Sequence, residues 1–384
     1  MTLSAALNIA DLERLARARL PHGVYQFIAG GTEDDNTRDR NRTVFDQWRL
    51  APKMFVDVSG RTLESTLFGH RYAMPLGIAP MGLTTICWQE ADLALARAAA
   101  GANLPFIVSG ASTVPLEVLA ANTPGPSWYQ AYIPSDRARI EALVARLLAA
   151  DYEVLVVTAD AQIGANRENN VRTGFAMPFR LNRKMIAGGL THPRWLLGTL
   201  LPTLLRSGIP HFENFEATRG SSIITQQADA WRANRDRLDW ADMRWLRSIW
   251  PKRFVLKGIL RADDARRAVD AGADGVIVSN HGGRQLDGAL SSIEALPDIV
   301  DAVGDRLVVM VDSGIRRGTD VMKALALGAK HVFVGRPVLF GTAVGGEAGA
   351  KHALGILRSE LDRDFGLTGC VSVADLDRSL VRRA

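Results

Sequence analysis

The chain has 384 residues, 47% of them hydrophobic, and a formal net charge of +5 at pH 7. That length can bury a full core, either as two ordinary domains or as one α/β barrel with additions. Only two cysteines are present, Cys87 and Cys370, which excludes a disulfide framework and a cysteine-based metal site. So few cysteines indicate a reducing compartment. No stretch reaches the roughly 18 to 20 apolar residues that span a bilayer, so we expect no spanning helix.

The first 20 residues predict an amphipathic helix rather than a signal peptide. Asp11 and Glu13 interrupt the apolar pattern, so no continuous hydrophobic core of signal-peptide type is present. Asn8 is a possible N-cap, with Asp11 three residues further on, and we expect the helix to end before Pro21.

Eight short apolar runs along the chain predict β-strands, at 75–80, 106–110, 127–132, 154–160, 254–259, 275–280, 307–312 and 332–336. Helical segments rich in Ala, Leu and Arg separate them, as at 91–100, 137–150, 262–271 and 320–327. This alternation predicts parallel strands with right-handed crossovers, and eight such units close into a (β/α)8 TIM barrel. The alternative, a doubly wound open sheet, would need a glycine fingerprint after its first strand, and residues 75–83 lack one. We therefore predict one domain over residues 1–384, with an N-terminal helical extension.

The sixth strand, Gly275–Asn280, ends in a segment that carries a base and a cation. The β-branched run of this strand would be buried on both faces, and it delivers His281 and Arg284 to a loop. Gly282 and Gly283 allow the backbone to turn with positive φ, or allow a flat ligand to come close. The alternative is a tight turn with a solvated His and Arg.

Polar side chains also follow the other strands, at the rim where chemistry occurs in such barrels. The last two loops, Asp312–Arg316 and Gly335–Pro337, combine glycines with Arg316 and Arg336. Glycine backbone N–H groups, a helix N-terminus and two guanidiniums predict a phosphorylated cofactor at this position.

With these residues the chain resembles the FMN-dependent α-hydroxy acid dehydrogenase and oxidase family, over most of its length from about Asp11. The most specific match is the segment Ser279–Gln285, SNHGGRQ. Supporting matches are Tyr25 with Gly30-Gly31, Pro80 with Gly82, Gln130 with Tyr132, Thr158 with Asp160, Arg167, Lys257-Gly258, and Asp312-Ser313-Gly314 with Arg316. The resemblance implies bound FMN, oxidation of an L-2-hydroxy acid to the 2-oxo acid, and a homotetramer.

The resemblance also implies roles for the polar residues. His281 would be the base, Asp160 would stabilise the imidazolium that forms, and Arg167 and Arg284 would hold the substrate carboxylate. Tyr132 and Tyr25 would donate hydroxyl hydrogen bonds to the substrate, and Gly82 would leave room for an aromatic group. His281, Asp160, Tyr132 and Arg284 thus form the predicted catalytic set.

The flavin would lie against a second set of residues. Lys257 would face the N1 and C2 carbonyl region of the reduced flavin, because a buried lysine needs an anionic partner. The predicted cofactor-binding residues are Ala79, Pro80, Met81, Ser109, Gln130, Thr158, Lys257, Ser279, Asp312, Ser313, Gly314, Arg316, Gly335 and Arg336. For Ser109, Gln130 and Thr158, ordinary strand-end hydrogen bonding is the alternative. No histidine or cysteine spacing predicts a metal site.

An insertion at residues 171–220 lengthens the connection between the fourth and fifth strands. It holds seven Arg or Lys residues against two Glu, an excess of +5. A stripe of Trp195 and six leucines between 196 and 205 recurs at helical spacing, interrupted by Pro202. Such a basic, apolar segment suits an interfacial helix among anionic headgroups, or a lid over the active site. Residues 226–249 read as the barrel helix expected before the fifth strand.

These features together predict a membrane-associated, FMN-dependent L-2-hydroxy acid dehydrogenase, peripheral on the cytoplasmic face of the cell membrane. An (S)-mandelate-like substrate is favoured, with L-lactate close behind, and a quinone would accept the electrons. The alternatives are a soluble oxidase that uses oxygen, a flavin barrel that acts on a phosphorylated substrate, and a non-catalytic membrane-surface protein. Nucleic-acid binding is not indicated, because the basic excess lies in one apolar insertion without a reading motif.

Overall fold

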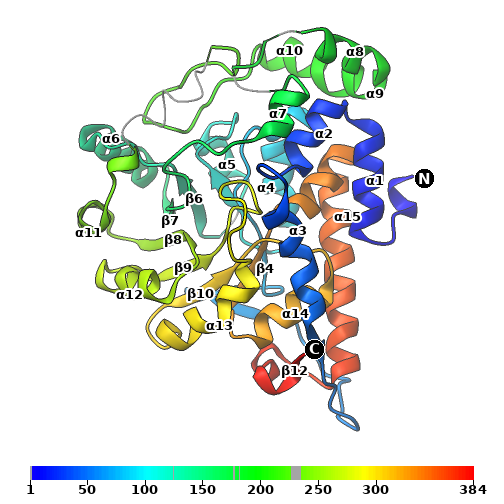
Figure 1. Ribbon diagram of the computed structural model, residues 1–384, viewed down its shortest axis with the longest axis vertical. Helices are drawn as coiled ribbons and strands as arrows, with labels where there is room; N and C mark the ends of the chain where they lie inside the picture. The colour runs from blue at the N-terminus through cyan, green and yellow to red at the C-terminus, as the bar shows by residue number, and fades with distance from the viewer. Residues whose placement is uncertain (1, 124, 176–177, 181, 226–234) are drawn as a thin grey trace.

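The architecture, seen in a computed structural model, is built on a ring of eight parallel strands (Figure 1). The structure describes residues 2–123, 125–175, 178–180, 182–225 and 235–384. The strands are β4 (Leu76–Ile78), β5 (Ile107–Ser109), β6 (Ser127–Ala131), β7 (Tyr152–Thr158), β8 (Arg253–Ile259), β9 (Gly275–Val278), β10 (Val308–Val311) and β11 (His331–Val334). β4 pairs with β11, and a parallel bridge between Ile78 and Phe106 joins it to the segment that enters β5. The predicted barrel and all eight predicted strands are confirmed, and the open doubly wound sheet is wrong.

The strands form because their side chains are buried on both faces of the sheet. Along β7, Val154 and Val156 point into the barrel, where they meet Val255, Ile277 and Phe333 from other strands. The alternating residues of the same strands belong to the larger apolar cluster between sheet and helices. β-branched residues pack well on such a pleated surface, which explains the near-continuous apolar runs in the sequence.

Helices surround the ring and connect successive strands: α4 (Ala91–Gly101), α5 (Leu116–Ala121), α6 (Arg137–Ala149), α11 (Trp240–Ile249), α12 (Ala262–Asp270), α13 (Ser292–Val303), α14 (Gly318–Ala326) and α15 (Arg336–Thr368). Local sequence sets where several of them begin. Asp136 caps α6 by accepting from the backbone N–H of Ala138 and Arg139, and Ser291 forms a capping box with Glu294 at the start of α13. Of the helix predicted at 226–249, α11 is confirmed, and residues 226–234 lie outside the described part of the chain.

The N-terminal extension packs on the outside of the barrel. It contains α1 (Ile9–Arg19), α2 (His22–Ala29) and α3 (Asn36–Thr43), and α1 lies along α15 (Figure 1). The Asn8 side chain accepts from the Asp11 N–H at 2.9 Å, so the predicted N-cap is confirmed. At the lower end of the molecule in Figure 1, β1 (Trp48–Leu50) pairs with β12 (Val381–Arg383). β2 (Ser65–Leu67) forms a hairpin with β3 (His70–Tyr72).

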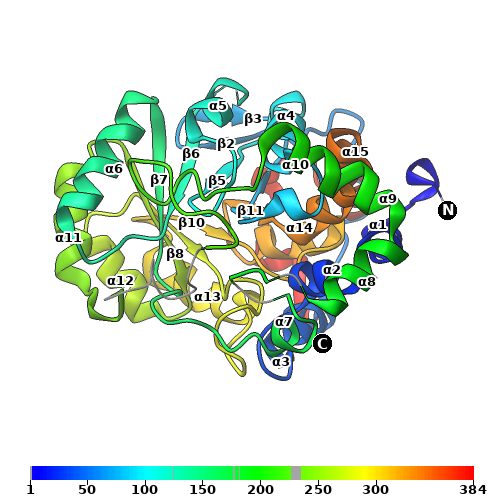
Figure 2. The ribbon, with the colours of Figure 1, turned by 90° about the horizontal axis from the view of Figure 1, so that it is seen from above.

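The insertion lies across the opposite end of the molecule. It begins at the end of α7 (Glu168–Arg172) and contains α8 (Arg183–Thr191), α9 (Pro193–Trp195), a π-helical turn η4 (Leu196–Leu200) and α10 (Leu201–Ser207). Seen from above, α8, α9 and α10 run in sequence over one side of the barrel mouth (Figure 2). Short 3-10 turns complete the described chain at Leu3–Ala5, Val44–Gln47, Thr84–Ile86, Arg235–Arg237, Val373–Asp375 and Arg378–Leu380. Nowhere in the described ranges is a helix both long and apolar enough to cross a membrane.

Candidate active site

A cavity of about 410 Å³ opens at the carboxyl ends of the barrel strands. Most of the predicted site residues meet there, although they come from loops that lie far apart in the sequence. Those that line the cavity are Ala79, Pro80, Met81, Gly82, Gln130, Tyr132, Thr158, Arg167, Lys257, His281, Arg284, Asp312, Ser313, Gly314, Arg316, Gly335 and Arg336. Of the other predicted residues, Asp160 lies directly behind His281, while Tyr25, Ser109 and Ser279 are set back from the cavity wall.

His281 stands at the centre of this rim with its ring held from two sides. Its backbone is in the left-handed region at φ 58°, and its N–H donates to the Ser279 hydroxyl at 3.0 Å. The ring Nδ1 lies 3.0 Å from a carboxylate oxygen of Asp160. The ring Nε2 lies 3.4 Å from the Tyr132 hydroxyl, on the cavity side. The carboxylate therefore fixes the orientation of the imidazole and leaves Nε2 to face a ligand.

The electrostatics of this pair suit a general base. Burial lowers the pKa of His281, and the nearby Asp160 offsets only part of that shift, so the imidazole is neutral at pH 7. Burial alone would raise the pKa of Asp160, but His281 and Lys257 hold it below its ordinary value. The site thus combines a neutral imidazole with an ionised carboxylate behind it, ready to stabilise an imidazolium.

Two guanidiniums, those of Arg167 and Arg284, lie beside the histidine. Arg284 donates to the backbone carbonyls of Phe27 at 2.8 Å and Gly30 at 3.0 Å, and its charge lies 5.4 Å from the centre of the Phe27 ring. Arg167 donates to the carbonyl of Arg284 at 3.2 and 3.3 Å, from two nitrogens. Burial, and then the proximity of Arg167 and Arg336, lowers the pKa of Arg284. A buried concentration of positive charge of this kind favours an anionic ligand.

Lys257 is buried at the end of β8 and has a protein partner. Its ammonium lies 2.8 Å from the Asp312 carboxylate and donates to the Ser279 hydroxyl at 2.6 Å. Burial alone would lower the pKa of Lys257, but Asp312 and Asp160 raise it above its ordinary value, so the ammonium stays charged. Sequence reasoning assigned the anionic partner to a flavin, and missed that Asp312, at the end of β10 two strands away, neutralises the lysine.

The last two loops form a cationic cradle. Burial, with the guanidinium of Arg336 nearby, lowers the pKa of Arg316 to about 9, and burial lowers that of Arg336 to about 10. Within the described residues, neither guanidinium forms an ion pair with a carboxylate. Gly314 has φ +84°, and a side chain there would collide with the backbone carbonyl of Asn41. A phosphate would supply the negative charge that this cradle lacks.

Three predicted residues are placed differently from what the sequence suggested. The Tyr25 hydroxyl donates to Glu13 at 3.1 Å, away from the cavity, and it is Phe27 that reaches the wall. The Tyr25 hydroxyl is thus directed away from the cavity, because the two positions face different sides of α2, and its contact with a substrate stays a prediction. Ser109 donates to Gln130 at 3.1 Å and Ser279 braces Lys257 and His281, so both support residues of the wall.

Gly82 does line the cavity, but the space beside it is already filled. A Cβ atom at Gly82 would lie 2.5 Å from the Cβ of Ala111. The missing side chain thus lets the segments that follow β4 and β5 approach each other. That the cavity beside Gly82 admits an aromatic substrate group stays a prediction.

Several residues of the cavity wall were not predicted from the sequence. Phe212 and Phe215 come from the insertion, Cys87 from the loop after β4, and Asn170 and Val171 from α7. Arg235 is also buried behind the wall, with its guanidinium 5.2 Å from the Tyr132 ring centre and its Nε donating to the Ile133 carbonyl. Burial raises the pKa of Tyr132, and the cations Arg167 and Arg235 oppose that shift. None of these positions belongs to a short motif, so only the fold brings them to the site.

The cavity meets the requirements of a flavin mononucleotide. The buried, unneutralised guanidiniums at one end match a phosphate, and the amide and hydroxyl of Gln130 and Thr158, 2.8 Å apart, offer polar groups at the edge of a flat ring. A neutral imidazole and the buried pair Arg167 and Arg284 lie at the same opening. Fold and site together define a barrel oxidoreductase that carries a phosphorylated cofactor and acts on an anionic substrate.

Comparison with known proteins identifies the family. Residues 16–383 match the family described as FMN-dependent dehydrogenase, and the chain belongs to that family. It is 42% identical to (S)-mandelate dehydrogenase of Pseudomonas putida, over 96% of this chain and 92% of that protein, and 41% identical to L-lactate oxidase of a Nostoc species, over 99% of both. A crystal structure of the monotopic membrane protein (S)-mandelate dehydrogenase superposes with a TM-score of 0.92 at 40% identity, covering 99% of this chain and 100% of that chain.

Family membership confirms the sequence-based assignment of FMN as cofactor and of 2-hydroxy acid oxidation as the reaction class. It decides against a non-catalytic protein and against a flavin barrel of another reaction class. The relatives differ in substrate and in the acceptor that their names imply, so these two properties depend on the residues of this chain.

Proposed function

We propose that the protein oxidises an L-2-hydroxy acid, with an aromatic or medium-sized one such as (S)-mandelate favoured and L-lactate close behind. The observation that carries the substrate preference is the aromatic wall beyond His281. The ring centres of Phe212 and Phe215 lie 4.8 Å apart, and Phe215 meets the Tyr132 ring edge-on at 6.1 Å. Offset and edge-on contacts of this kind stabilise a phenyl group better than a methyl group. The similarity to an (S)-mandelate dehydrogenase supports the same preference.

The polar residues around His281 have separate roles in substrate binding, substrate orientation and proton transfer. Arg167 and Arg284 hold the substrate carboxylate by charge-assisted hydrogen bonds and so orient the α-carbon. His281 removes a substrate proton at Nε2, since Nδ1 is directed to Asp160. Asp160 stays ionised and stabilises the imidazolium, and Tyr132, 3.4 Å from Nε2, donates its hydroxyl to the substrate.

Bound FMN supplies the acceptor for the two electrons that leave the substrate. The residues suited to hold it are the phosphate cradle of Arg316, Arg336 and Gly314, with Gln130, Thr158 and Lys257 beside the ring. The Lys257 ammonium keeps positive charge at that edge even though Asp312 pairs with it.

Exchange of Phe215 tests the substrate preference. In Phe215→Leu, kcat/KM for (S)-mandelate should fall about tenfold, the loss of one aromatic contact, while that for L-lactate should change less than twofold. Equal effects on both substrates, or an enzyme that prefers L-lactate from the outset, would show that the wall does not select an aromatic group.

The insertion is proposed to place this site on a membrane surface, where a quinone would accept the electrons. Trp195, Thr199 and Thr203, at intervals of four, are buried, and the Trp195 ring N–H donates to the Ile86 carbonyl at 2.7 Å. Leu197, Leu201 and Leu205, offset by two residues, face outward, and Leu205 is 83% exposed. The segment is thus anchored to the body by one face, which leaves an apolar face without a protein partner in the described chain.

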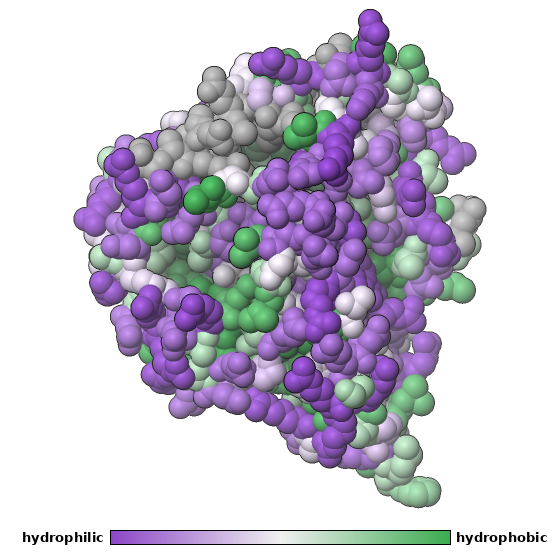
Figure 3. All heavy atoms as spheres, viewed as in Figure 1, coloured by the Kyte–Doolittle hydropathy of each residue, from purple (hydrophilic) through white to green (hydrophobic). Residues whose placement is uncertain are grey.

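Basic side chains flank that apolar face. Arg183, Lys184, Arg194 and Arg206 are all exposed on α8 to α10. Apolar groups buried at the headgroup boundary with cations around them are the signature of an interfacial segment. The same insertion supplies Phe212 and Phe215 to the cavity, so its two predicted roles, membrane contact and lid, are compatible. Hydrophobic side chains show along the upper rim, where these helices lie, and also at the lower tip (Figure 3).

The lower tip provides a matched control for a membrane-binding experiment. Phe55 is fully exposed, at 108%, and follows β1, which pairs with β12 at the end away from α10 (Figure 1). Replacing Leu197, Leu201 and Leu205 with Gln should abolish co-sedimentation with phosphatidylglycerol vesicles, while Phe55→Gln should not, and turnover with a soluble dye should survive in both. Unchanged sedimentation of the triple variant would contradict membrane contact. The homotetramer stays a prediction, which light scattering on the holoenzyme can test.

A further inference from the structure

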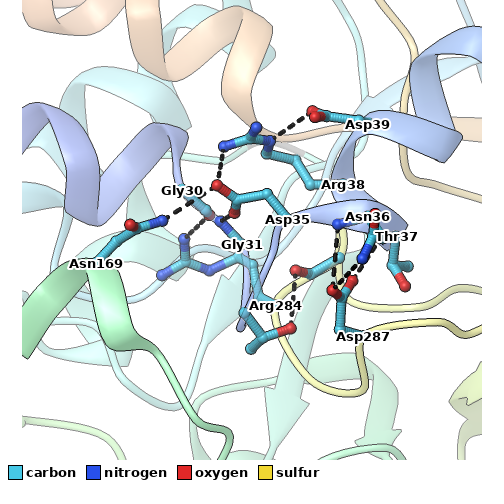
Figure 4. Close-up of polar contacts among 12 residues, drawn as sticks. Gly30, Gly31, Asp35, Asn36, Thr37, Arg38, Asp39, Asn169, Arg284 and Asp287 are labelled. Atoms are coloured by element: carbon cyan, nitrogen blue, oxygen red, sulfur yellow. Dashed lines mark hydrogen bonds and ion pairs between the residues drawn. The ribbon is translucent and has the colours of Figure 1, made fainter.

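The N-terminal segment between α2 and α3 reaches the active-site loops and joins them through one carboxylate, that of Asp35 (Figure 4). One Asp35 oxygen accepts from the Gly31 N–H at 2.6 Å. The other accepts from Arg38 at 2.6 Å and from the Asn169 side-chain amide at 3.2 Å. The backbone of Asp35 is left-handed, at φ 64°, which turns the segment so that these donors converge.

The first of these contacts leads to Arg284. The Gly30 carbonyl, one residue before the Gly31 N–H that Asp35 holds, accepts from Arg284 at 3.0 Å. A Cβ at Gly31 would lie 2.5 Å from the carbonyl of Gly283, so the two loops are in direct contact there. Fixing the Gly30–Gly31 peptide therefore fixes the acceptor that orients the Arg284 guanidinium.

The second contact leads to Arg167. Asn169 lies in the first turn of α7, and Arg167 is the N-cap of that helix. The Glu33 N–H also donates to the carbonyl of Asn166, the residue before that N-cap, at 3.1 Å, so the segment contacts the chain on both sides of Arg167. Arg167 in turn donates to the carbonyl of Arg284. One carboxylate outside the cavity thus connects both guanidiniums that face the substrate.

The charge balance gives Asp35 a second effect. Burial, and then Arg167 and Arg336, lower the pKa of Arg284, and Tyr132 and Asp35 oppose that shift. In a buried group of three guanidiniums, one nearby anion reduces the repulsion that would drive the side chains apart.

We propose that Asp35 is a positioning residue that holds Arg284 and Arg167 at the spacing required by the substrate carboxylate. The inference rests on the proposed role of these two arginines. Asp35 touches neither substrate nor cofactor, and its effect is on substrate binding, not on proton transfer at His281. Loss of Asp35 therefore raises KM and leaves the rate of flavin reduction at saturating substrate nearly unchanged.

The test compares three variants of the FMN-loaded enzyme. Asp35→Asn removes the charge, and Asn169→Ala removes only the link to α7. Asp39→Asn is the matched control, because Asp39 binds the same Arg38 at 2.8 Å but is 63% exposed and contacts neither Gly31 nor Asn169. KM for (S)-mandelate and the dissociation constant of phenylacetate, a carboxylate that cannot reduce the flavin, are measured for each, the latter from the flavin difference spectrum.

Both Asp35→Asn and Asn169→Ala should raise KM and the phenylacetate dissociation constant about tenfold, with less than a twofold change in the limiting reduction rate. The double variant should show less than the product of the two effects, because both substitutions break the same link. An unchanged KM, an equal effect of Asp39→Asn, or a loss confined to the reduction rate would overturn the proposal. If Asp35→Asn does not fold, Asn169→Ala decides the matter alone.

Arg284→Met separates this inference from the function on which it rests. Unaltered phenylacetate binding in Arg284→Met would refute the carboxylate role of the arginine itself. Weakened binding in Arg284→Met with normal binding in both Asp35→Asn and Asn169→Ala would overturn only the positioning role of Asp35.

Discussion

Replacing Asp160 with asparagine removes the charge behind the catalytic imidazole while keeping the shape of the side chain. The ring Nδ1 and the carboxylate oxygen are 3.0 Å apart, so the charge centres of an imidazolium–aspartate pair lie about 4 Å apart. At an effective dielectric constant of about 20, that attraction amounts to about 4 kcal/mol. Because it exists only once His281 has accepted a proton, its loss should slow flavin reduction by roughly 10²- to 10³-fold.

The assay is anaerobic stopped-flow mixing with (S)-mandelate, following the loss of flavin absorbance at about 450 nm. Phenylacetate binding should stay within about twofold of wild type, because the proposed carboxylate ligands are the two arginines, which this substitution leaves in place. Asp151→Asn, on a carboxylate at the exposed surface that pairs with Lys252, serves as the control and should have no effect. A reduction rate within threefold of wild type in Asp160→Asn would refute the assigned role.

The pH dependence of kcat/KM tests the same role of Asp160, because the direction in which its acid limb moves can be predicted. A base works when neutral, and burial lowers the pKa of His281 below its ordinary 6.5, so kcat/KM of the wild type should stay level to below pH 6.5 and fall only in more acid solution. Asp160 raises that pKa. In Asp160→Asn the plateau should therefore drop and the acid limb should move to still lower pH. An acid limb that moves upward would contradict the electrostatic reasoning.

Other substitutions test individual placements. Tyr25→Phe should change kcat/KM by less than twofold, because its hydroxyl is bound to the side chain of a residue outside the cavity; a tenfold loss in steady-state assays would show that it reaches the substrate. Gly82→Ala should destabilise the protein by about 1–3 kcal/mol in urea unfolding, and adding Ala111→Gly should restore most of that loss, since the two positions compete for one space. Lys257→Met should lower the free energy of unfolding by about 3–5 kcal/mol, because it leaves Asp312 buried without its partner. Adding Asp312→Asn to this variant should restore part of that free energy. If the losses of the two single variants simply added, the pairing would be contradicted.

The barrel could be predicted from the sequence because its signal is local and repeated. Runs such as 154–160 and 307–312 are buried on both faces, so they are apolar up to their polar carboxyl ends, and each strand can be recognised without knowledge of its neighbours. The pairing of β1 with β12 was not predicted, because three-residue strands more than 300 positions apart carry no such pattern.

The site residues likewise fall into those that a local motif predicts and those that only the fold brings together. His281 and Arg284 were predictable from a motif within one loop, and the fold confirms that Arg167, over 100 residues away, meets them. The structure directs the Tyr25 hydroxyl to Glu13 and brings Phe27 to the cavity wall, which the sequence did not indicate, since residues two apart on a helix face different directions and the register of α2 was not known. The Lys257–Asp312 pair and the aromatic wall of Phe212 and Phe215 depend on contacts between distant segments, which no local pattern indicates.

The central claim is that one imidazole and two guanidiniums, gathered from separate loops, present a 2-hydroxy acid to bound FMN in one orientation. Anaerobic mixing of the yellow holoenzyme with each enantiomer of mandelate tests this directly. The (S)-enantiomer should bleach the flavin within the dead time of manual mixing, and the (R)-enantiomer should leave it oxidised. A flavin that stays oxidised with (S)-mandelate, L-lactate and other L-2-hydroxy acids alike, or one bleached equally by both enantiomers, would contradict the account.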